Sequence, residues 1–197
     1  MREARWIVAT VCLALVVIVG GALVWRAGVL TPAEAPAVGG PFRLTDQDGR
    51  RVDEHILKGK WSLVFFGFTY CPEACPTTLA TYGAALEQLG PKARNVQVVF
   101  ISVDPQRDTP AALKAYLSSA AFPRRTIGLT GSPAEVAAAA KAYKVYYQKS
   151  GNGPDYTVDH STLTYLIDPR GRFRRLIAYG LTPDEVARQL GEAMRES

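Results

Sequence analysis

The stretch WSLVFFGFTYCPEACPTTL (residues 61–79) joins a continuous apolar run to a pair of cysteines. Its first eight residues carry no charge, and such a run suits a strand that is buried in the centre of a sheet. Pro76 suits the first position of a helix, which makes Cys75 the expected N-cap residue. A buried strand that leads directly into a helix is the building unit of α/β folds, so this stretch predicts that fold class.

The chain on either side of this stretch alternates between strand and helix patterns. Before it, residues 42–54 predict two short strands around an Asp48-Gly49 turn. After it, the spacing of apolar residues predicts helices at 76–90, 109–120, 132–145 and 182–196, and strands at 96–103, 126–131, 145–149, 162–168 and 172–180. This order predicts a thioredoxin-like α/β sandwich over residues 42–197, in which helices flank a mixed central sheet with an N-terminal β-hairpin.

Residues 1–26 predict a membrane anchor. From Trp6 to Trp25 the chain runs for 20 residues without a charge, which matches a hydrocarbon core of about 30 Å. Two arginines precede this run and one follows it, so the positive-inside rule predicts a cytoplasmic N-terminus and a domain outside. A cleavable signal peptide with the small-residue site at 33–35 is the alternative, but the run exceeds the usual apolar region of about 7–15 residues.

The segment after the anchor, residues 27–41, is rich in Ala, Pro and Gly and is expected to be a tether. Cys12 lies within the apolar run, where it is expected to act as a small apolar side chain without a functional role. The charged N-terminus lacks a Ser-rich, transit-like stretch. We therefore expect a single pass through a bacterial inner membrane, rather than a mitochondrial one, with the domain on the periplasmic side.

The net charge does not indicate nucleic-acid binding. The chain carries 23 Lys and Arg against 18 Asp and Glu, a net charge of +5, and the excess is scattered. Nucleic-acid binding usually requires basic residues that cluster on one face. The pairs Arg124-Arg125 and Arg174-Arg175 are therefore expected to be solvated surface.

Cys71 and Cys75 allow three interpretations. A disulfide is sterically possible at this spacing, but so short a ring would stabilise a domain of this size little. A thioredoxin-type redox catalyst has two residues between its cysteines, whereas this pair has three. The wider spacing leaves room for a metal ion, and the helix N-terminus favours the thiolates that would bind it. Phe68 and Tyr70 flank the pair and either shield it or pack into the core.

Two thiolates are an incomplete metal site, and the chain has two histidines that could complete it. His55 lies in a polar stretch before the first central strand, where an ordinary surface or capping role is expected. His160 ends a polar loop just before a predicted strand, so its imidazole is expected at the sheet edge that carries the cysteines. Spacing alone leaves His160 open as a metal ligand or as a hydrogen-bonded structural histidine.

Three segments together resemble a known family: FFGFTYCPEACPTTL (65–79), ISVDPQRDTP (101–110) and YTVDHSTLTYLIDPRGRF (156–173). They are similar to the Sco/SenC family of membrane-tethered copper chaperones for cytochrome c oxidase assembly, and the likeness covers residues 38–195 and the anchor. The resemblance implies that Cys71, Cys75 and His160 bind copper, as Cu(I) or Cu(II). It also implies a site on the outer face of the cytoplasmic membrane or in the mitochondrial intermembrane space.

The chemistry of the donor atoms agrees with this implication. Two soft thiolates favour Cu(I), and an added imidazole makes Cu(II) acceptable. The expected function is a carrier rather than an enzyme, which delivers copper to the binuclear site of the oxidase's copper-binding subunit or to another copper chaperone. The alternative is a thiol-disulfide oxidoreductase in which Cys71 and Cys75 cycle, and which prepares the cysteines of that subunit for metal.

Three acidic residues are candidates for a supporting role. Asp155 and Asp159 precede His160, and one of them is expected to orient its ring by accepting a hydrogen bond from the second ring nitrogen. For Asp155, a role in the turn is the alternative. Asp104 leaves the second central strand at the same edge of the sheet, where helix capping or turn formation is expected and partner recognition is secondary.

Overall fold

The computed structural model describes residues 2–26, 38–153 and 155–196, in two compact units that divide between Ala37 and Val38. The first unit contains the helix α1 (Arg2–Arg26). Within the three described ranges, no helix combines the length and the apolarity needed to cross a membrane. The helix expected of the anchor is thus observed, whereas its passage through a membrane is not confirmed. The side chain of Cys12 and most of the expected tether lie outside the described residues.

The second unit contains the strands and the remaining helices. Its strands are β1 (Arg43–Asp46), β2 (Arg51–Asp53), β3 (Trp61–Gly67), β4 (Val96–Ser102), β5 (Thr126–Thr130), β6 (Tyr147–Ser150), β7 (Thr157–His160), β8 (Thr164–Ile167) and β9 (Phe173–Ile177). Its α-helices are α2 (Ala74–Leu89), α3 (Pro110–Leu117), α4 (Pro133–Ala142) and α5 (Pro183–Arg195), and its short 3-10 helices are η1 (Glu54–Leu57) and η2 (Gly90–Asn95). All of the strands and helices predicted for this unit are therefore present, most of them with shorter bounds.

Seven strands form one mixed sheet in the order β2-β1-β5-β4-β3-β8-β9. The central strands β3, β4 and β5 are parallel, while β1 and β8 run antiparallel to their neighbours in this core. β1 pairs with β2 as the N-terminal hairpin, and β8 pairs with β9 across a turn at residues 168–172. The predicted mixed sheet flanked by helices is confirmed.

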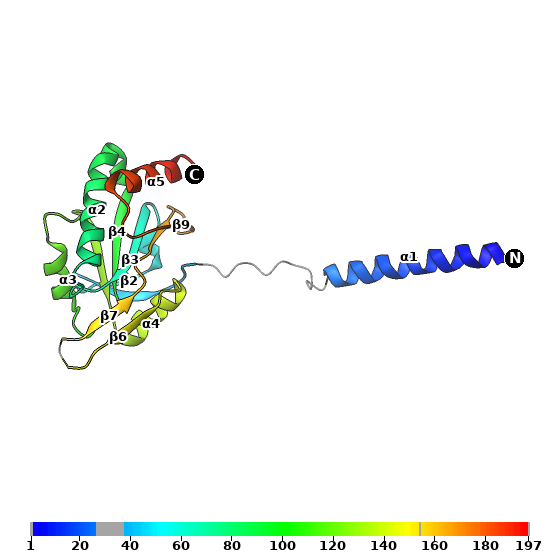
Figure 1. The fold of residues 1–197 in the computed structure, drawn as a ribbon, viewed down its shortest axis with the longest axis horizontal. Helices are drawn as coiled ribbons and strands as arrows, with labels where there is room; N and C mark the ends of the chain where they lie inside the picture. The colour runs from blue at the N-terminus through cyan, green and yellow to red at the C-terminus, as the bar shows by residue number, and fades with distance from the viewer. Residues whose placement is uncertain (1, 27–37, 154, 197) are drawn as a thin grey trace. The chain divides into compact units, whose positions relative to one another are not determined.

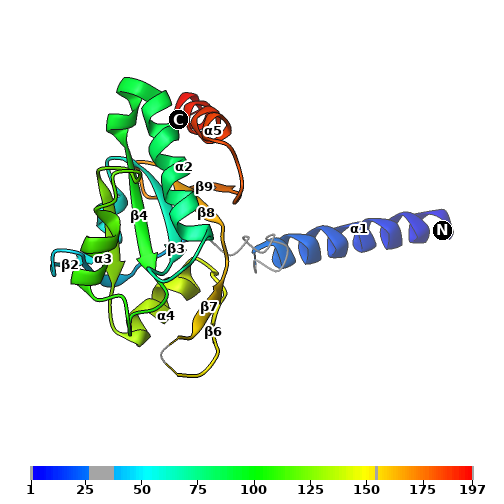
Figure 2. The same cartoon turned by 60° about the vertical axis from the view of Figure 1, so that its left-hand side comes forward.

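Neighbouring residues of β3 point to opposite faces of the sheet, and two phenylalanines show what covers each face. Phe65 contacts Phe100, whose ring packs against Tyr116 of α3 at a centroid distance of 5.9 Å. Phe66 packs on the other side against Tyr143, which caps the C-terminus of α4, at 5.4 Å. α5 packs beside α2, as both views show (Figure 1 and Figure 2). Every residue of β3 and β4 is buried, so these two strands form the centre of the core.

β6 and β7 form a separate two-stranded antiparallel sheet, called the ribbon below. It lies at the opposite end of the unit from α5 (Figure 1 and Figure 2). The expectation of a polar loop up to His160 is wrong, because residues 157–160 pair with β6. Tyr156 and Val158 are buried and alternate with the exposed Thr157 and Asp159, so the period-2 pattern of a strand is present but short, and the polar residues around it hide it.

α2 begins earlier than its sequence predicts. Its N-cap is Glu73, which makes no side-chain capping bond, so Cys75 and Pro76 are the second and third helical residues. The expectation that Cys75 is the N-cap is therefore wrong. Pro76 is tolerated there because the N–H groups of the first turn have no acceptor within the helix. Thr77 N makes the first hydrogen bond of this turn, to Glu73 O at 3.1 Å.

The other three predicted helix starts are confirmed, and two of them carry a capping box. Ser132 and Glu135 form a reciprocal capping box at the start of α4, as do Thr182 and Glu185 at the start of α5. Each box satisfies two N–H groups that would otherwise lack partners.

Candidate metal centre

The side chains of Cys71, Cys75 and His160 converge on one point. Their ligand atoms all lie within 4.8 Å of one another, and Cys75 Sγ lies 3.7 Å from His160 Nε2. Cys71 follows the end of β3, Cys75 lies in the first turn of α2, and His160 is the last residue of β7. The convergence expected from the sequence is present although 85 residues separate Cys75 from His160 along the chain.

The two cysteines form no disulfide, and their pKa values are shifted in opposite directions. Cys71 Sγ accepts a hydrogen bond from Cys75 N at 3.3 Å. The neighbouring Cys75 thiol and this backbone N–H lower the pKa of Cys71 from 9.0 to about 4. The interaction with Cys71 and burial raise the pKa of Cys75. At neutral pH the pair therefore holds one thiolate, on Cys71, and one proton, on Cys75.

Gly67 makes room for the Cys75 sulfur. A Cβ atom at this position would lie 2.7 Å from Cys75 Sγ and 2.8 Å from the Phe100 ring. This role of Gly67 was not predicted from the sequence, because a glycine within an apolar run has no pattern that reveals what packs against it. A glycine inside a buried strand is nevertheless a signal of close approach.

The ring of His160 is held in the tautomer that a metal ligand needs. Its Nδ1 lies 2.9 Å from the carbonyl oxygen of Ser161, which can only accept a hydrogen bond. The proton is therefore on Nδ1, and the lone pair of Nε2 faces the sulfurs. Phe65 and Phe68 present their rings to the imidazole at centroid distances of 6.2 and 5.7 Å, with edge-to-face geometry. Phe68 thus packs into the core and also shields the site.

The expectation that Asp155 or Asp159 orients this ring is not met, since the Ser161 carbonyl makes that contact. Asp159 is exposed and neighbours His160 in β7, where successive side chains point to opposite faces. Asp155 is also exposed and precedes the strand, as suits a turn residue.

Asp104 forms a turn, as expected, but caps no helix. Its backbone oxygen accepts hydrogen bonds from Arg107 N and Asp108 N, while Thr109 is the N-cap of α3. The Asp104 side chain is buried, forms an ion pair with Arg107 and accepts a hydrogen bond from the Tyr156 hydroxyl at 2.6 Å.

Asp108 is a second buried carboxylate that the sequence analysis missed. It accepts hydrogen bonds from Thr69 N at 3.1 Å, Thr69 Oγ1 at 2.6 Å and Ser102 Oγ at 2.6 Å. Burial raises its pKa. These bonds tie the residues just before Cys71 to the end of β4, so Asp108 fixes the backbone that carries the first sulfur. Asp108 lies just before the start of α3, where an aspartate is usually read as a helix cap. Its contacts with Thr69 and Ser102 therefore could not be recognised from the sequence.

His55 lies in a second group of possible ligands, with Asp53 and Glu54. His55 is exposed, its Nδ1 lies 3.1 Å from Asp53 Oδ1, and Asp53 caps η1. The expected surface and capping role is observed.

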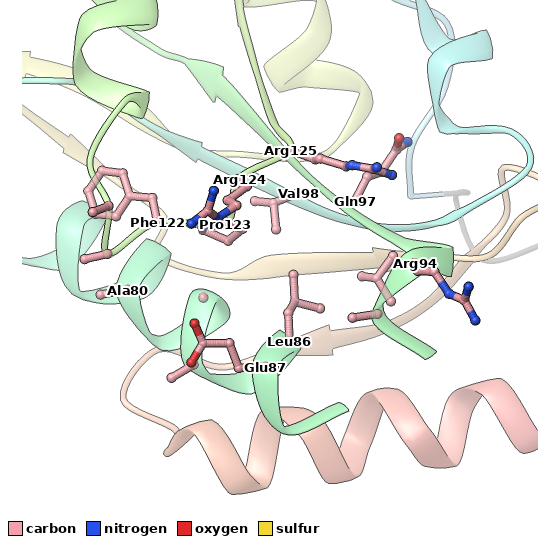
Figure 3. A pocket seen from close by; sticks show the side chains of 16 residues that line it. Ala80, Leu86, Glu87, Arg94, Gln97, Val98, Phe122, Pro123, Arg124 and Arg125 are labelled. Carbon is pink, nitrogen blue, oxygen red and sulfur yellow. The ribbon is translucent and has the colours of Figure 1, made fainter. Parts of the chain in front are cut away.

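A cavity of about 570 Å³ lies between α2, the start of β4 and the segment after α3 (Figure 3). Its walls include Ala80, Leu86, Val98 and Phe122. None of the candidate metal ligands lines it, so it is distinct from the cluster of Cys71, Cys75 and His160.

The SCO1/SenC family model matches residues 31–195 of this chain. Protein SCO1 homolog 1, mitochondrial, from Arabidopsis thaliana is 44% identical over 150 residues, which cover 75% of this chain and 44% of that protein. Protein SCO2, mitochondrial, from Saccharomyces cerevisiae is 45% identical over 153 residues, which cover 76% of this chain and 50% of that protein. The chain thus spans about half of the length of these two relatives.

Two solved structures match over most of the chain. The structure of Bradyrhizobium japonicum ScoI with copper bound is 47% identical, with a TM-score of 0.72, and covers 79% of this chain and 99% of its own. The structure of BsSco is 26% identical, with a TM-score of 0.64. BsSco is a member of the Sco family of cytochrome c oxidase assembly proteins, and a disulfide switch has been identified in it. That match covers 82% of this chain and 96% of BsSco.

Proposed function

Because the chain belongs to the SCO1/SenC family, we propose that it carries copper for the assembly of cytochrome c oxidase. The observation on which this proposal rests is the meeting of Cys71 Sγ, Cys75 Sγ and a ring nitrogen of His160 within 4.8 Å. The related ScoI from Bradyrhizobium japonicum has been solved with copper bound, which supports copper as the cargo.

The donor set suits copper in both oxidation states. The Cys71 thiolate and the Nε2 lone pair of His160 are available without a proton transfer. Cys75 keeps its proton at neutral pH, so copper binding would release that proton. Soft sulfur ligands stabilise Cu(I), whereas the imidazole nitrogen is the donor that Cu(II) favours.

Three protein ligands suit a carrier better than a permanent site. Structural zinc sites usually have four protein ligands, which leaves no position for an incoming group. With three, a thiolate or imidazole of an acceptor can bind the ion before the carrier's own ligands leave. We infer that the acceptor is the copper-binding subunit of the oxidase or another copper chaperone.

We further infer that the protein works at a membrane surface. The support is the sequence of α1, with its 20 uncharged residues from Trp6 to Trp25. A single pass with a cytoplasmic N-terminus would hold the copper domain on the periplasmic side of the inner membrane.

The test is copper binding by the full-length chain with His160→Ala. We expect the wild type to bind one copper ion with a thiolate-to-Cu(II) absorption band, and the variant to lose the band and more than about 100-fold of its Cu(II) affinity. His55→Ala, which removes an exposed histidine, is the matched control and should behave as the wild type. An unaltered band and stoichiometry in His160→Ala would overturn the carrier function.

A second candidate function is thiol-disulfide exchange, favoured by the low pKa of Cys71. The Cys71 thiolate would attack a partner disulfide, form a mixed disulfide and release one partner thiolate. Cys75, once deprotonated, would then close the Cys71–Cys75 disulfide and release the second thiol. In sum the dithiol loses two electrons and two protons, and the partner disulfide is reduced to two thiols.

The two functions differ in their need for His160. Dithiol cycling with a glutathione redox buffer should survive His160→Ala, and Cys75→Ala should trap the mixed disulfide. Failure to form the Cys71–Cys75 disulfide at any buffer potential would exclude the redox function and leave the carrier function intact.

A further inference from the structure

We propose that Arg107 is a positioning residue that clamps the ribbon carrying His160 against the loop carrying Cys71. The proposal rests on the proposed function, since it concerns the geometry of the same copper ligands. Arg107 is not itself one of the three ligands. It acts through the aromatic rings of Tyr156, in the segment that leads into β7, and Tyr70, in the loop after β3.

On the ribbon side, Arg107 makes two kinds of contact with Tyr156. Its Nη1 donates a hydrogen bond to Tyr156 O at 2.9 Å, and its guanidinium lies 3.7 Å from the centre of the Tyr156 ring. The Tyr156 hydroxyl donates to Asp104, which in turn forms an ion pair with Arg107. The three side chains close a ring of contacts, and Tyr156 is held at its backbone, its ring face and its hydroxyl.

On the cysteine side, the same guanidinium lies 4.5 Å from the centre of the Tyr70 ring and 5.9 Å from that of Phe68. Tyr70 directly precedes Cys71 and is 65% exposed. A side chain this exposed has little packing to fix it, so the stacking on Arg107 determines where it lies. A guanidinium suits this place because its planar group can stack on aromatic rings and also donate hydrogen bonds at its edge.

The ribbon needs such a clamp because it is not part of the main sheet. β6 and β7 pair only with each other in the described structure. Next to this ladder, Ser161 N donates to Tyr146 O at 2.9 Å and Tyr146 N donates to Ser161 Oγ at 3.2 Å, which continues the pairing of the two strands with each other. Arg107 instead ties the ribbon to another segment, the loop after β4, four residues before His160. Its side chain is 14% exposed and that of Asp104 is 4% exposed, so the ion pair is shielded from solvent.

This arrangement predicts that Arg107 acts on one oxidation state of copper more than on the other. If the clamp is lost, the ribbon moves and the His160 imidazole lies farther from the two sulfurs. Cys71 and Cys75 keep their positions, because they are attached to β3 and α2 rather than to the ribbon. Two thiolates are sufficient for Cu(I), whereas Cu(II) depends on the nitrogen ligand. The Cu(II) affinity should therefore fall and the Cu(I) affinity should change little.

The first experiment uses the metal-free, reduced, full-length chain and needs no copper. Hydrogen–deuterium exchange should be at least tenfold faster in the ribbon of Arg107→Met than in that of the wild type, with β3 and β4 unchanged. Arg172→Met is the matched control, because Arg172 also forms an ion pair with a buried aspartate, Asp168, in the β8–β9 turn. Equal exchange in the ribbons of Arg107→Met and wild type would overturn the clamp.

The second experiment measures the affinity for Cu(II) and for Cu(I) in the same variants. Arg107→Met should weaken Cu(II) binding about 10- to 100-fold and Cu(I) binding less than threefold. A parallel loss of both affinities would indicate a general structural role and would overturn the proposal. If His160→Ala leaves Cu(II) binding intact while Arg107→Met frees the ribbon, the proposed function falls and the clamp stands.

Arg107→Met leaves the buried Asp104 without its cation and could therefore misfold. A second variant tests the clamp without removing this ion pair. Tyr70→Leu removes only the contact of Arg107 on the cysteine side. Because Tyr70 is exposed, we expect this substitution to leave the stability of the fold largely unchanged. It should raise ribbon exchange and lower the Cu(II) affinity in the same sense as Arg107→Met, by a smaller factor. Wild-type values for both readouts in Tyr70→Leu would contradict the role of the stacked rings.

Discussion

β3 and the ribbon deliver ligands to the same cluster but are held in opposite ways. β3 is buried along its whole length and pairs with β4 on one side and β8 on the other. In the ribbon, β6 is largely exposed, and Val158 is the buried residue of β7. The sulfurs are therefore attached to the most constrained part of the domain, and the nitrogen to one of its least constrained parts.

This difference suggests how the proposed carrier can release its cargo. Moving the sulfurs would disturb α2, where Cys75 packs against Gly67 of β3, and the Asp108 hydrogen bonds that hold the loop before Cys71, which is costly in a close-packed core. Moving His160 requires only that the ribbon detach from the loop that carries Cys71. We therefore expect the imidazole to be the first ligand to leave, and the predictions below test the two regions separately.

The largest expected effect is on the thiol pair at the core. Cys75→Ala removes the group that contributes most to the low pKa of Cys71, so the titration midpoint of Cys71 should rise by several pH units, from about 4 toward 9.0. The ultraviolet absorbance of the thiolate in metal-free protein measures this midpoint. Cys71→Ala, the control, should abolish the titration below neutral pH. A midpoint that stays near 4 in Cys75→Ala would contradict the assigned sharing of the proton.

The same pKa shift has a consequence for stability. Between pH 4 and pH 9 the folded protein has released a Cys71 proton that the unfolded chain still holds, so this group makes the free energy of unfolding rise with pH. Its contribution is lost as the pH falls through about 4. Denaturant titrations of metal-free wild type and Cys71→Ala over this range should show a flatter pH dependence in the variant.

The second effect, also on the core side, concerns Gly67. The Cβ of Gly67→Ala would overlap Cys75 Sγ and the Phe100 ring, so we expect a loss of about 3 kcal/mol in the free energy of unfolding and a weaker copper site. Gly40→Ala is the matched control, because its Cβ would meet only Ala142 Cβ at an ordinary 3.5 Å. Chemical denaturation measures both, and equal stability of the two variants would refute the close packing at Gly67.

The third prediction compares the same substitution in the two regions. Val99→Ala, in β4, should lower the free energy of global unfolding by about 2 kcal/mol. Val158→Ala, in β7, should lower it by less than about 1 kcal/mol and instead speed hydrogen exchange within the ribbon. If both variants lower global stability equally, the ribbon is as firmly attached as the core, and the contrast between the regions fails.

The smallest effect is expected at Asp159. Its side chain is exposed on the face of the ribbon opposite His160, so Asp159→Asn should change stability by less than about 0.5 kcal/mol. Its copper affinity should stay within twofold of the wild type, as measured by competition with a chelator. A loss comparable to that of His160→Ala would show that this carboxylate supports the ring after all.

The sequence predicts most of the fold because its signals are local. The continuous apolar runs of β3 and β4 and the Ser132 capping box each need only neighbouring residues to be recognised. The two errors concern weak local signals. The alternation of buried Tyr156 and Val158 with exposed Thr157 and Asp159 is too short to stand out in a polar stretch. α2 begins two residues before Pro76, and Glu73 makes no side-chain capping bond, so no capping residue marks its start.

For the site, the sequence by itself determined which atoms are available: two sulfurs near a helix N-terminus and one imidazole before a strand. Only the tertiary structure decided that they meet, that the Ser161 carbonyl rather than a carboxylate fixes the tautomer of His160, and that Gly67 makes space for Cys75. It also placed Arg107 between the two ligand-bearing segments. The reason is physical: the identity of a donor belongs to one residue, whereas its direction, proton and neighbours depend on packing between segments far apart in the chain.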